Sequence, residues 1–170
     1  MDDLWTPLVA IGTWALAVAT IVALRYQVRV AVHAIGAEAF SRSTERWDSP
    51  EMRGRRRRLA QALVSGGTIP ENVILDVIDF FEDLGTALRA GSLSKEQAFN
   101  GFSTAARNYW AVCGQNFAGE QRKSGDPTFY TEFEYFVREV NRLQERKAGK
   151  PTDLTKTVLD EFLASEASLS

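Results

Sequence analysis

The chain has very little cysteine and histidine: one residue of each, Cys113 and His33, among 170. A single cysteine excludes an intramolecular disulfide and a metal site built from several thiolates. A single histidine removes most histidine-based catalytic and metal-binding arrangements. No Gly-rich phosphate loop and no nucleophile–base set is recognisable, so we expect no enzymatic activity, no metal and no cofactor. We expect Cys113 to be a buried, inert thiol and His33 to pack among apolar neighbours.

Basic residues are absent from the first 24 positions, where the only charges are Asp2 and Asp3. The 21 residues from Leu4 to Leu24 carry no charge, and nine of them are Leu, Ile or Val. About 20 apolar residues cross a hydrocarbon core of ~30 Å, so residues 1–24 are predicted to hold a transmembrane helix. A signal peptide, which favours a basic start and a shorter apolar core, and a buried core helix are the less favoured alternatives.

The residues that flank this stretch predict its orientation. Trp5 and Tyr26 are 21 positions apart, which suits aromatic side chains at the two membrane interfaces. Arg25 and Arg29 follow the stretch and no basic residue precedes it. The positive-inside rule therefore predicts an N-terminus outside and a C-terminal domain in the cytoplasm. Small residues at Gly12, Ala15, Ala19 and Ala23 would let two such helices approach closely, although alanine is common in membrane helices generally.

The remaining chain is predicted to be all-α, because no run alternates with a period of two residues. Residues 25–48 are expected to continue the first helix as a juxtamembrane segment. Residues 49–150 are expected to form a cytosolic antiparallel helical bundle, and residues 151–170 a C-terminal helix and tail. The expected helices of these two parts run from Ser49-Pro50 to Val64, from a capping box of Thr68 and Glu71 to Gly91, from a capping box of Ser94 and Gln97 past Phe117, from Asp126-Pro127 to Gly149, and from Asp153 to Ser165.

Each of these helices carries an apolar stripe at helical spacing, and the stripes predict the core. The stripe of the third helix is Ile74, Val77, Ile78, Phe81, Leu84 and Leu88. The next two helices offer mostly aromatic residues, namely Phe99, Phe102, Tyr109, Trp110 and Phe117, then Phe129, Phe133 and Phe136. The last helix offers Leu154, Val158 and Phe162, and whether it packs on the bundle is left open.

Five arginines fall between Arg53 and Arg58. A solvated helix in which one or two of them pair with acids is the plainest interpretation. Contact with anionic lipid head groups is the functional alternative, worth about 1 kcal/mol for each basic residue at the surface. Nucleic-acid binding is the least favoured interpretation. A helix spreads these arginines around its circumference, which counts against both the lipid and the nucleic-acid interpretation. The candidate lipid-contacting residues are Arg25, Arg29, Arg53, Arg55 and Arg56.

Four acids gather between positions 76 and 83. Asp76, Asp79 and Asp83 lie opposite the apolar stripe, so a solvated face is expected in place of a metal site. Glu82 lies near the edge of the stripe, where a carboxylate needs a partner. We expect it to form a structural ion pair with an arginine of the 53–58 run or with Arg107.

Several short motifs resemble those of a bacterial family of uncharacterised proteins. They are Phe80-Phe81-Glu82-Asp83-Leu84-Gly85, Tyr109-Trp110, Arg122, Asp126-Pro127 and Phe133-Glu134. The resemblance covers roughly Leu4 to Arg146. It implies one N-terminal membrane span, a cytosolic helical domain of unknown function and an inner-membrane setting, and it implies no activity.

The sequence thus favours a single-span membrane protein whose bundle serves as an interaction or scaffold module. A regulatory or sensory module that binds a partner helix or a small ligand is the alternative. The expected partners are the lipid bilayer, anionic head groups, and either another protein or a second copy of the chain.

Overall fold

A computed structural model describes residues 5–67, 69, 71–149 and 153–170; within the first helix, the side chains of residues 5–12, 15, 32 and 33 lie outside this description. The described part of the chain is helical and contains no strand, which confirms the predicted all-α class. The elements are α1 (Trp5–Asp48), α2 (Pro50–Ser65), α3 (Glu71–Arg89), α4 (Lys95–Tyr109), the π-helical turn η1 (Trp110–Gly114), α5 (Gln115–Ser124), α6 (Thr131–Ala148) and α7 (Lys156–Ala167).

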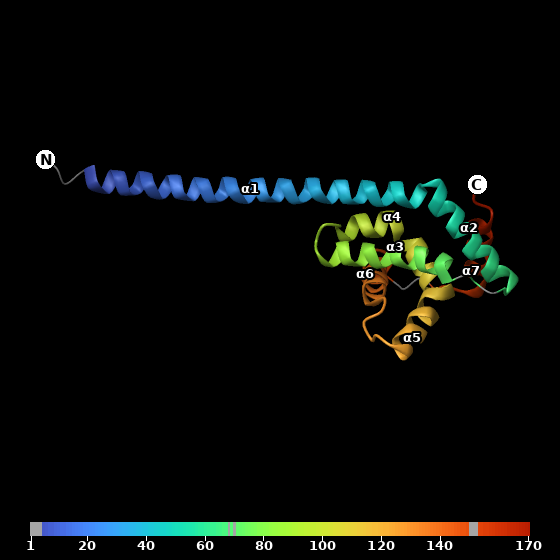
Figure 1. The fold of residues 1–170 in the computed structure, drawn as a ribbon. Helices are drawn as coiled ribbons and strands as arrows, with labels where there is room; N and C mark the ends of the chain where they lie inside the picture. Colours follow the sequence, from blue (N-terminus) through green and yellow to red (C-terminus); the bar gives the residue numbers. More distant parts are fainter. Residues whose placement is uncertain (1–4, 68, 70, 150–152) are drawn as a thin grey trace.

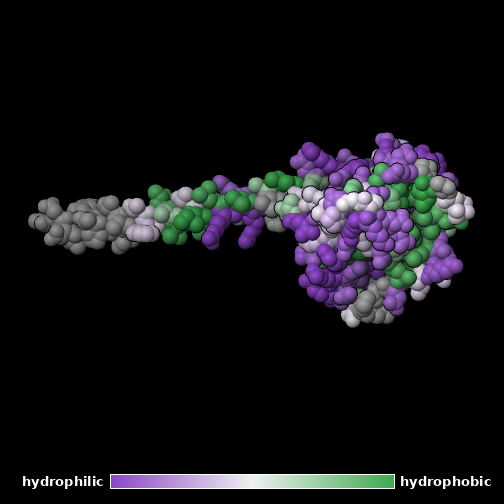
Figure 2. Space-filling model, turned by 60° about the horizontal axis from the view of Figure 1, so that its bottom comes forward, coloured by the Kyte–Doolittle hydropathy of each residue, from purple (hydrophilic) through white to green (hydrophobic). Residues whose placement is uncertain are grey.

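Helix α1 is one continuous rod of 44 residues, about 66 Å long at 1.5 Å per residue (Figure 1). Residues 25–48 continue the first helix, as predicted. Within the described residues, one helix, α1 from Leu16 onward, is long and apolar enough to cross a membrane, and none of its apolar window is buried. Figure 2 shows hydrophobic side chains along the part of the rod that projects from the bundle. The side chains of Trp5 and His33 lie outside the described residues.

The C-terminal part of α1 belongs to the bundle. The carbonyl of Gly36 accepts a hydrogen bond from Nε2 of Gln97 at 3.3 Å. The ring of Phe40 packs edge-on against Phe102, and the indole of Trp47 lies 4.8 Å from the ring of Phe80. One continuous helix therefore forms both the projecting rod and a wall of the core.

The helix boundaries follow local signals that the sequence contains. Ser49 caps α2 by accepting the Met52 N–H at 3.2 Å, and Gly66 ends that helix with a φ of 63°. Ser94 and Gln97 form the expected reciprocal capping box of α4. The capping box expected from Thr68 lies outside the described residues.

Helix α3 forms the centre of the bundle, and its predicted stripe is buried throughout. Phe81 stacks on Phe133 of α6 with ring centroids 4.8 Å apart. Figure 1 views α6 nearly end-on, so α6 crosses α3 while α4 runs beside it. A Cβ atom on Gly85 would lie only 2.0 Å from the carbonyl oxygen of Glu132, which explains why a residue without a side chain occupies this crossing.

Two features of the second half of the bundle differ from the prediction. Helix α6 begins at Thr131, not at Asp126, because the Asp126 carboxylate accepts the Thr128 N–H at 2.7 Å and closes a local turn. The long helix after Ser94 contains the π-helical turn η1, which stripe spacing did not indicate.

The last helix begins near Lys156 behind the cap Thr155, and its buried residues are Leu163 and Glu166. Val158, expected in its stripe, is exposed. Helix α7 packs on α2, so the open question of its docking is settled (Figure 1).

Candidate functional sites

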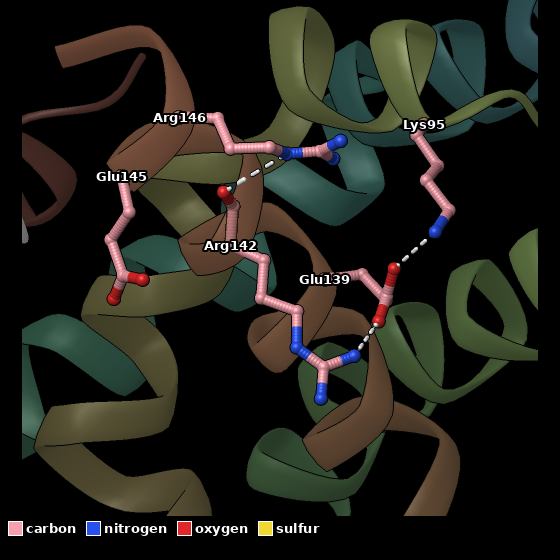
Figure 3. Close-up of a pocket in the computed structure, with 5 residues that line it drawn as sticks. All are labelled: Lys95, Glu139, Arg142, Glu145 and Arg146. Atoms are coloured by element: carbon pink, nitrogen blue, oxygen red, sulfur yellow. Dashed lines mark hydrogen bonds and ion pairs between the residues drawn. The ribbon is translucent and has the colours of Figure 1, made fainter. Parts of the chain in front are cut away.

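A concave surface of about 510 Å³ lies between the start of α4 and the second half of α6 (Figure 3). Its lining residues are Lys95, Glu139, Arg142, Glu145 and Arg146, and we call it the cationic pocket. Glu139 accepts Nζ of Lys95 and Nη1 of Arg142, each at 2.5 Å. The Glu139 side chain is 5% exposed, whereas those of Lys95 and Arg142 are 51% and 67% exposed.

The two cations of the cationic pocket are held by an ionised Glu139. The hydrogen bond from Lys95 lowers the pKa of Glu139, and Arg142 adds to this effect against the opposing effect of burial. Glu139 is therefore an anion that holds two cations at an open surface. Arg146 donates to the Arg142 carbonyl at 3.4 Å, and Glu145 points away from this group in Figure 3. Such a surface suits a small anion, for example a phosphate or a carboxylate.

A second charged cluster is buried where α1, α2, α4 and α7 meet. Arg56 donates from Nε and Nη2 to the two oxygens of Glu166, both at 2.7 Å. The hydroxyl of Tyr109 donates to the same carboxylate at 2.6 Å. Arg56 also donates to the Trp47 carbonyl at 3.2 Å, and its guanidinium carbon lies 3.9 Å from the centre of the Trp47 ring. We call Trp47, Arg56 and Tyr109 the carboxylate site.

Both charges of this cluster are withdrawn from water. The side chains of Arg56 and Glu166 are 7% and 9% exposed. Burial lowers the pKa of Arg56, but the hydrogen bond and charge of Glu166 outweigh burial and raise it overall. Burial and the neighbouring carboxylate raise the pKa of Tyr109, so its hydroxyl stays a donor. The site is therefore built to hold one carboxylate.

The structure corrects the expected ion pair between Glu82 and Arg107. Glu82 accepts backbone N–H groups of Glu132 at 3.3 Å and Phe133 at 2.6 Å. These are donors of the first turn of α6, which have no partner inside the helix, and Tyr130 provides no side-chain cap there. Burial raises the pKa of Glu82 despite these bonds.

Arg107 lies elsewhere, in a pocket of about 290 Å³ beside η1 that Trp110, Asn141 and Gln144 also line. Burial lowers its pKa.

The other acids of α3 do not gather into one site. Asp76 pairs with Arg55 at 2.7 Å, Asp83 pairs with Arg46 at 2.6 Å, and Asp79 accepts the Tyr130 hydroxyl at 3.2 Å. Within the described ranges, no three His, Cys, Asp or Glu residues lie close enough to hold a metal ion. Cys113 is buried, as predicted, and burial raises the pKa of its thiol to about 12.

The candidate lipid-contacting residues separate into two groups. Arg25 and Arg29 are exposed on α1. Arg56 is buried against Glu166, which contradicts a contact with head groups. Arg55 bridges Glu51 and Asp76 at 2.6 and 2.7 Å, and Arg53 lies 4.0 Å from Asp48. All three belong to α2, at the end of the bundle farthest from the N-terminus (Figure 1). Pairing with acids, the plainer interpretation, describes them better.

Sequence reasoning missed Glu139, Glu166 and Lys95. Glu139 follows Phe136 by three positions and Glu166 follows Leu163 by three, so both acids share a face with buried apolar residues. That spacing was the available signal. Arg142 lies three positions after Glu139, a spacing that could have indicated this pair. The other partners, Lys95 and Arg56, lie 44 and 110 positions from Glu139 and Glu166 and have no local signature.

Comparisons with known proteins point to a family without indicating an activity. No curated protein and no solved structure matches the chain. A family model described as a domain of unknown function matches residues 7–140, which include most of α1 and the bundle through the middle of α6. The chain therefore belongs to the DUF4760 family of uncharacterised proteins.

Proposed function

We propose that the protein is a single-span membrane protein whose helical bundle is an interaction or scaffold module that binds without catalysing a reaction. The proposed setting is a bacterial inner membrane, with the N-terminus outside and the bundle in the cytoplasm. The observation that carries the proposal is α1: the apolar window found from Leu16 onward is exposed, whereas the C-terminal part of the helix is built into the core.

The geometry of α1 supports a bundle held near the bilayer. Gly36 is the first buried residue of α1 among those whose side chains are described, and it lies 11 positions after Arg25, or about 16 Å along the helix. The end of α1 at Asp48 lies about 35 Å beyond Arg25. Arg25 and Arg29 would therefore be at head-group level, and α2 with its arginines would be out of reach.

The cationic pocket supports an anionic lipid surface as a partner. The loop between α3 and α4 lies at the end of the bundle that points along α1 toward the N-terminus (Figure 1). Lys95 begins α4 directly after this loop, so the pocket lies on the same end. The start of α4 is level with Gly36, about 16 Å beyond Arg25, which is about two screening lengths of 8 Å at physiological salt. The cations of the pocket would therefore add only weakly to the attraction of Arg25 and Arg29 for anionic head groups.

Cysteine labelling tests the membrane topology sharply, because Cys113 is the only cysteine and is buried. We expect a Ser170→Cys chain to react with a membrane-impermeant maleimide only after the cells are lysed. An Asp2→Cys chain is the matched control and should react in intact cells. Labelling of Ser170→Cys in intact cells, or a mature chain that lacks residue 2, would contradict the proposal; the second result would indicate a cleaved signal peptide.

A regulatory module that binds a partner helix is the second candidate. The docking of α7 favours it, because the bundle there already holds an amphipathic helix through a buried carboxylate.

A further inference from the structure

The carboxylate site receives a helix that lies outside the family match. Trp47, Arg56 and Tyr109 all fall within residues 7–140, the part of the chain that defines the family. Glu166, which fills the site, belongs to α7 at Lys156–Ala167. The receiving residues thus lie inside the matched range, and the helix bound to them lies beyond it.

Helix α7 is held mainly at one end. Its buried residues are Leu163 and Glu166, and the ring of Phe162 packs edge-on at 5.0 Å from Tyr109. The backbone beyond Glu166 accepts two exposed hydrogen bonds from α2, from Arg57 at 3.2 Å and from Gln61 at 3.3 Å. Val158, in the first turns of α7, is exposed. The ion pair between the Glu166 carboxylate and Arg56 is therefore the contact that determines the position of α7 on the bundle.

We propose that the carboxylate site is a helix-docking site, that α7 is its intramolecular occupant, and that an acidic amphipathic helix of a partner protein competes with α7 for it. The partner helix would present an aromatic residue, a leucine beside it and a glutamate one turn later, as Phe162, Leu163 and Glu166 do. This inference rests on the proposed interaction role, and it names the chemistry of the partner.

The chemistry of the site explains why it would select such a helix. The guanidinium of Arg56 presents two parallel N–H groups that match both carboxylate oxygens, and Tyr109 supplies a third donor. An uncharged side chain in place of the glutamate would leave the buried Arg56 charge without its counter-ion, which is strongly unfavourable. A helix without the glutamate is therefore rejected even when its apolar face fits.

Peptide binding to the full chain in neutral detergent micelles tests the proposal. The probe is a labelled peptide of residues 153–170. An attached helix competes at an effective concentration in the millimolar range, so the wild-type chain should bind the peptide weakly. The Glu166→Gln chain, whose own helix is loosened, should bind it at least about tenfold more tightly. The Glu161→Gln chain is the matched control, because Glu161 is exposed on the same helix, and it should behave as wild type.

Variants of the peptide give the reciprocal test on the Glu166→Gln chain. A peptide carrying Glu166→Gln should bind at least about tenfold more weakly than the unchanged peptide, and one carrying Glu161→Gln should bind equally well. Equal binding of all three peptides, or no gain for the Glu166→Gln chain, would overturn the proposal. A wild-type dimer that the peptide converts into a monomer would also overturn it, because the occupant would then be α7 of a second copy.

Hydrogen exchange of the wild-type chain keeps the proposal testable if the Glu166→Gln chain does not fold. A displaceable α7 opens without the bundle, so its amides should exchange at least about tenfold faster than the buried amides of α3. Exchange of α7 in step with α3 would show that α7 is a fixed part of the core, and would overturn the proposal. The topology experiment has a separate readout, so a failure here leaves the membrane anchor unaffected.

Discussion

The two buried carboxylates, Glu139 and Glu166, differ in the exposure of their partners. Glu139 is buried, but Lys95 and Arg142 reach it from the surface and are more than half exposed. Glu166 and Arg56 are both less than a tenth exposed. The ion pairs of Glu139 therefore lie at the protein surface, whereas the ion pair of Glu166 lies inside the protein.

This difference indicates which of the two ion pairs contributes more to the free energy of unfolding. Exposed cations keep most of their hydration and are screened by salt, so each contributes little. A pair with both partners buried has given up its hydration, and each charge then depends on the other. Loss of one partner at the carboxylate site should therefore cost far more than loss of one at the cationic pocket.

The largest effect on stability should come from the Arg56→Gln change. It leaves Glu166 buried without its counter-ion, and we expect a loss of about 3–5 kcal/mol in the free energy of unfolding. Chemical denaturation of the full chain in neutral detergent measures it. Arg58→Gln, an exposed position on the same helix, should change stability by less than about 0.5 kcal/mol. If the two variants were equally stable, Glu166 would not depend on Arg56 and the comparison would fail.

A smaller loss in the free energy of unfolding should follow from the Tyr109→Phe change. This change removes the hydroxyl that donates to Glu166 at 2.6 Å and keeps the ring that Phe162 contacts. Hydrogen bonds to charged groups contribute about 1.5–3 kcal/mol, so a loss in that range is expected in the same denaturation experiment. Tyr135→Phe is a suitable control, because its ring also packs in the bundle and against Arg89. A Tyr109→Phe chain as stable as wild type would show that Arg56 alone satisfies the carboxylate.

Local signals explain why the helices were largely predictable. Caps such as Ser49 and Ser94, and the stripe of α3, involve residues within one or two turns of each other. The start of α6 was misplaced because Asp126 has the residue type of a cap, yet it uses its carboxylate in a turn with Thr128. Whether an aspartate caps a helix or closes a turn depends on the backbone around it, which the sequence pattern does not fix.

The candidate sites were less predictable, because their pairs join distant segments. The position of Glu82 at the edge of a stripe correctly indicated that it needs a partner. Its partner is the backbone at the start of α6, and no side-chain pattern indicates a backbone donor 50 positions away. Arg56 was not singled out within the basic run, although it lies four positions after Met52 and three before Leu59, on the buried face of α2. Its partner Glu166 lies 110 positions away and has no local signature.

The Glu139→Gln change should have a moderate and pH-dependent effect on the free energy of unfolding. Hydrogen bonding to Lys95 lowers its pKa in the folded chain, so this group stabilises the fold above its unfolded pKa of about 4.3. That contribution is lost as the pH falls through the folded value. At neutral pH, Glu139→Gln should cost about 1 kcal/mol, and the wild-type chain should lose stability more steeply below about pH 4 than the variant.

Unfolding curves measured at several pH values test this effect. The other four charged groups that line the pocket, Lys95, Arg142, Glu145 and Arg146, are the same in both chains. Parallel loss of stability in the wild-type and Glu139→Gln chains would show that the pocket does not hold Glu139 as an anion.

The smallest effect on stability should come from the Arg142→Gln change. Its dependence on salt can be compared with that of the Arg56→Gln change. The exposed Arg142 should contribute less than about 1 kcal/mol, and that contribution should shrink between low salt and 1 M salt, where the screening length falls to about 3 Å. Arg138→Gln, an exposed arginine one turn earlier on α6, is the matched control outside the pocket. The loss caused by Arg56→Gln should stay nearly constant over the same salt range, because a buried pair is screened much less. Equal salt dependence of Arg56→Gln and Arg142→Gln would mean that water reaches Arg56, and the distinction between the two sites would no longer hold.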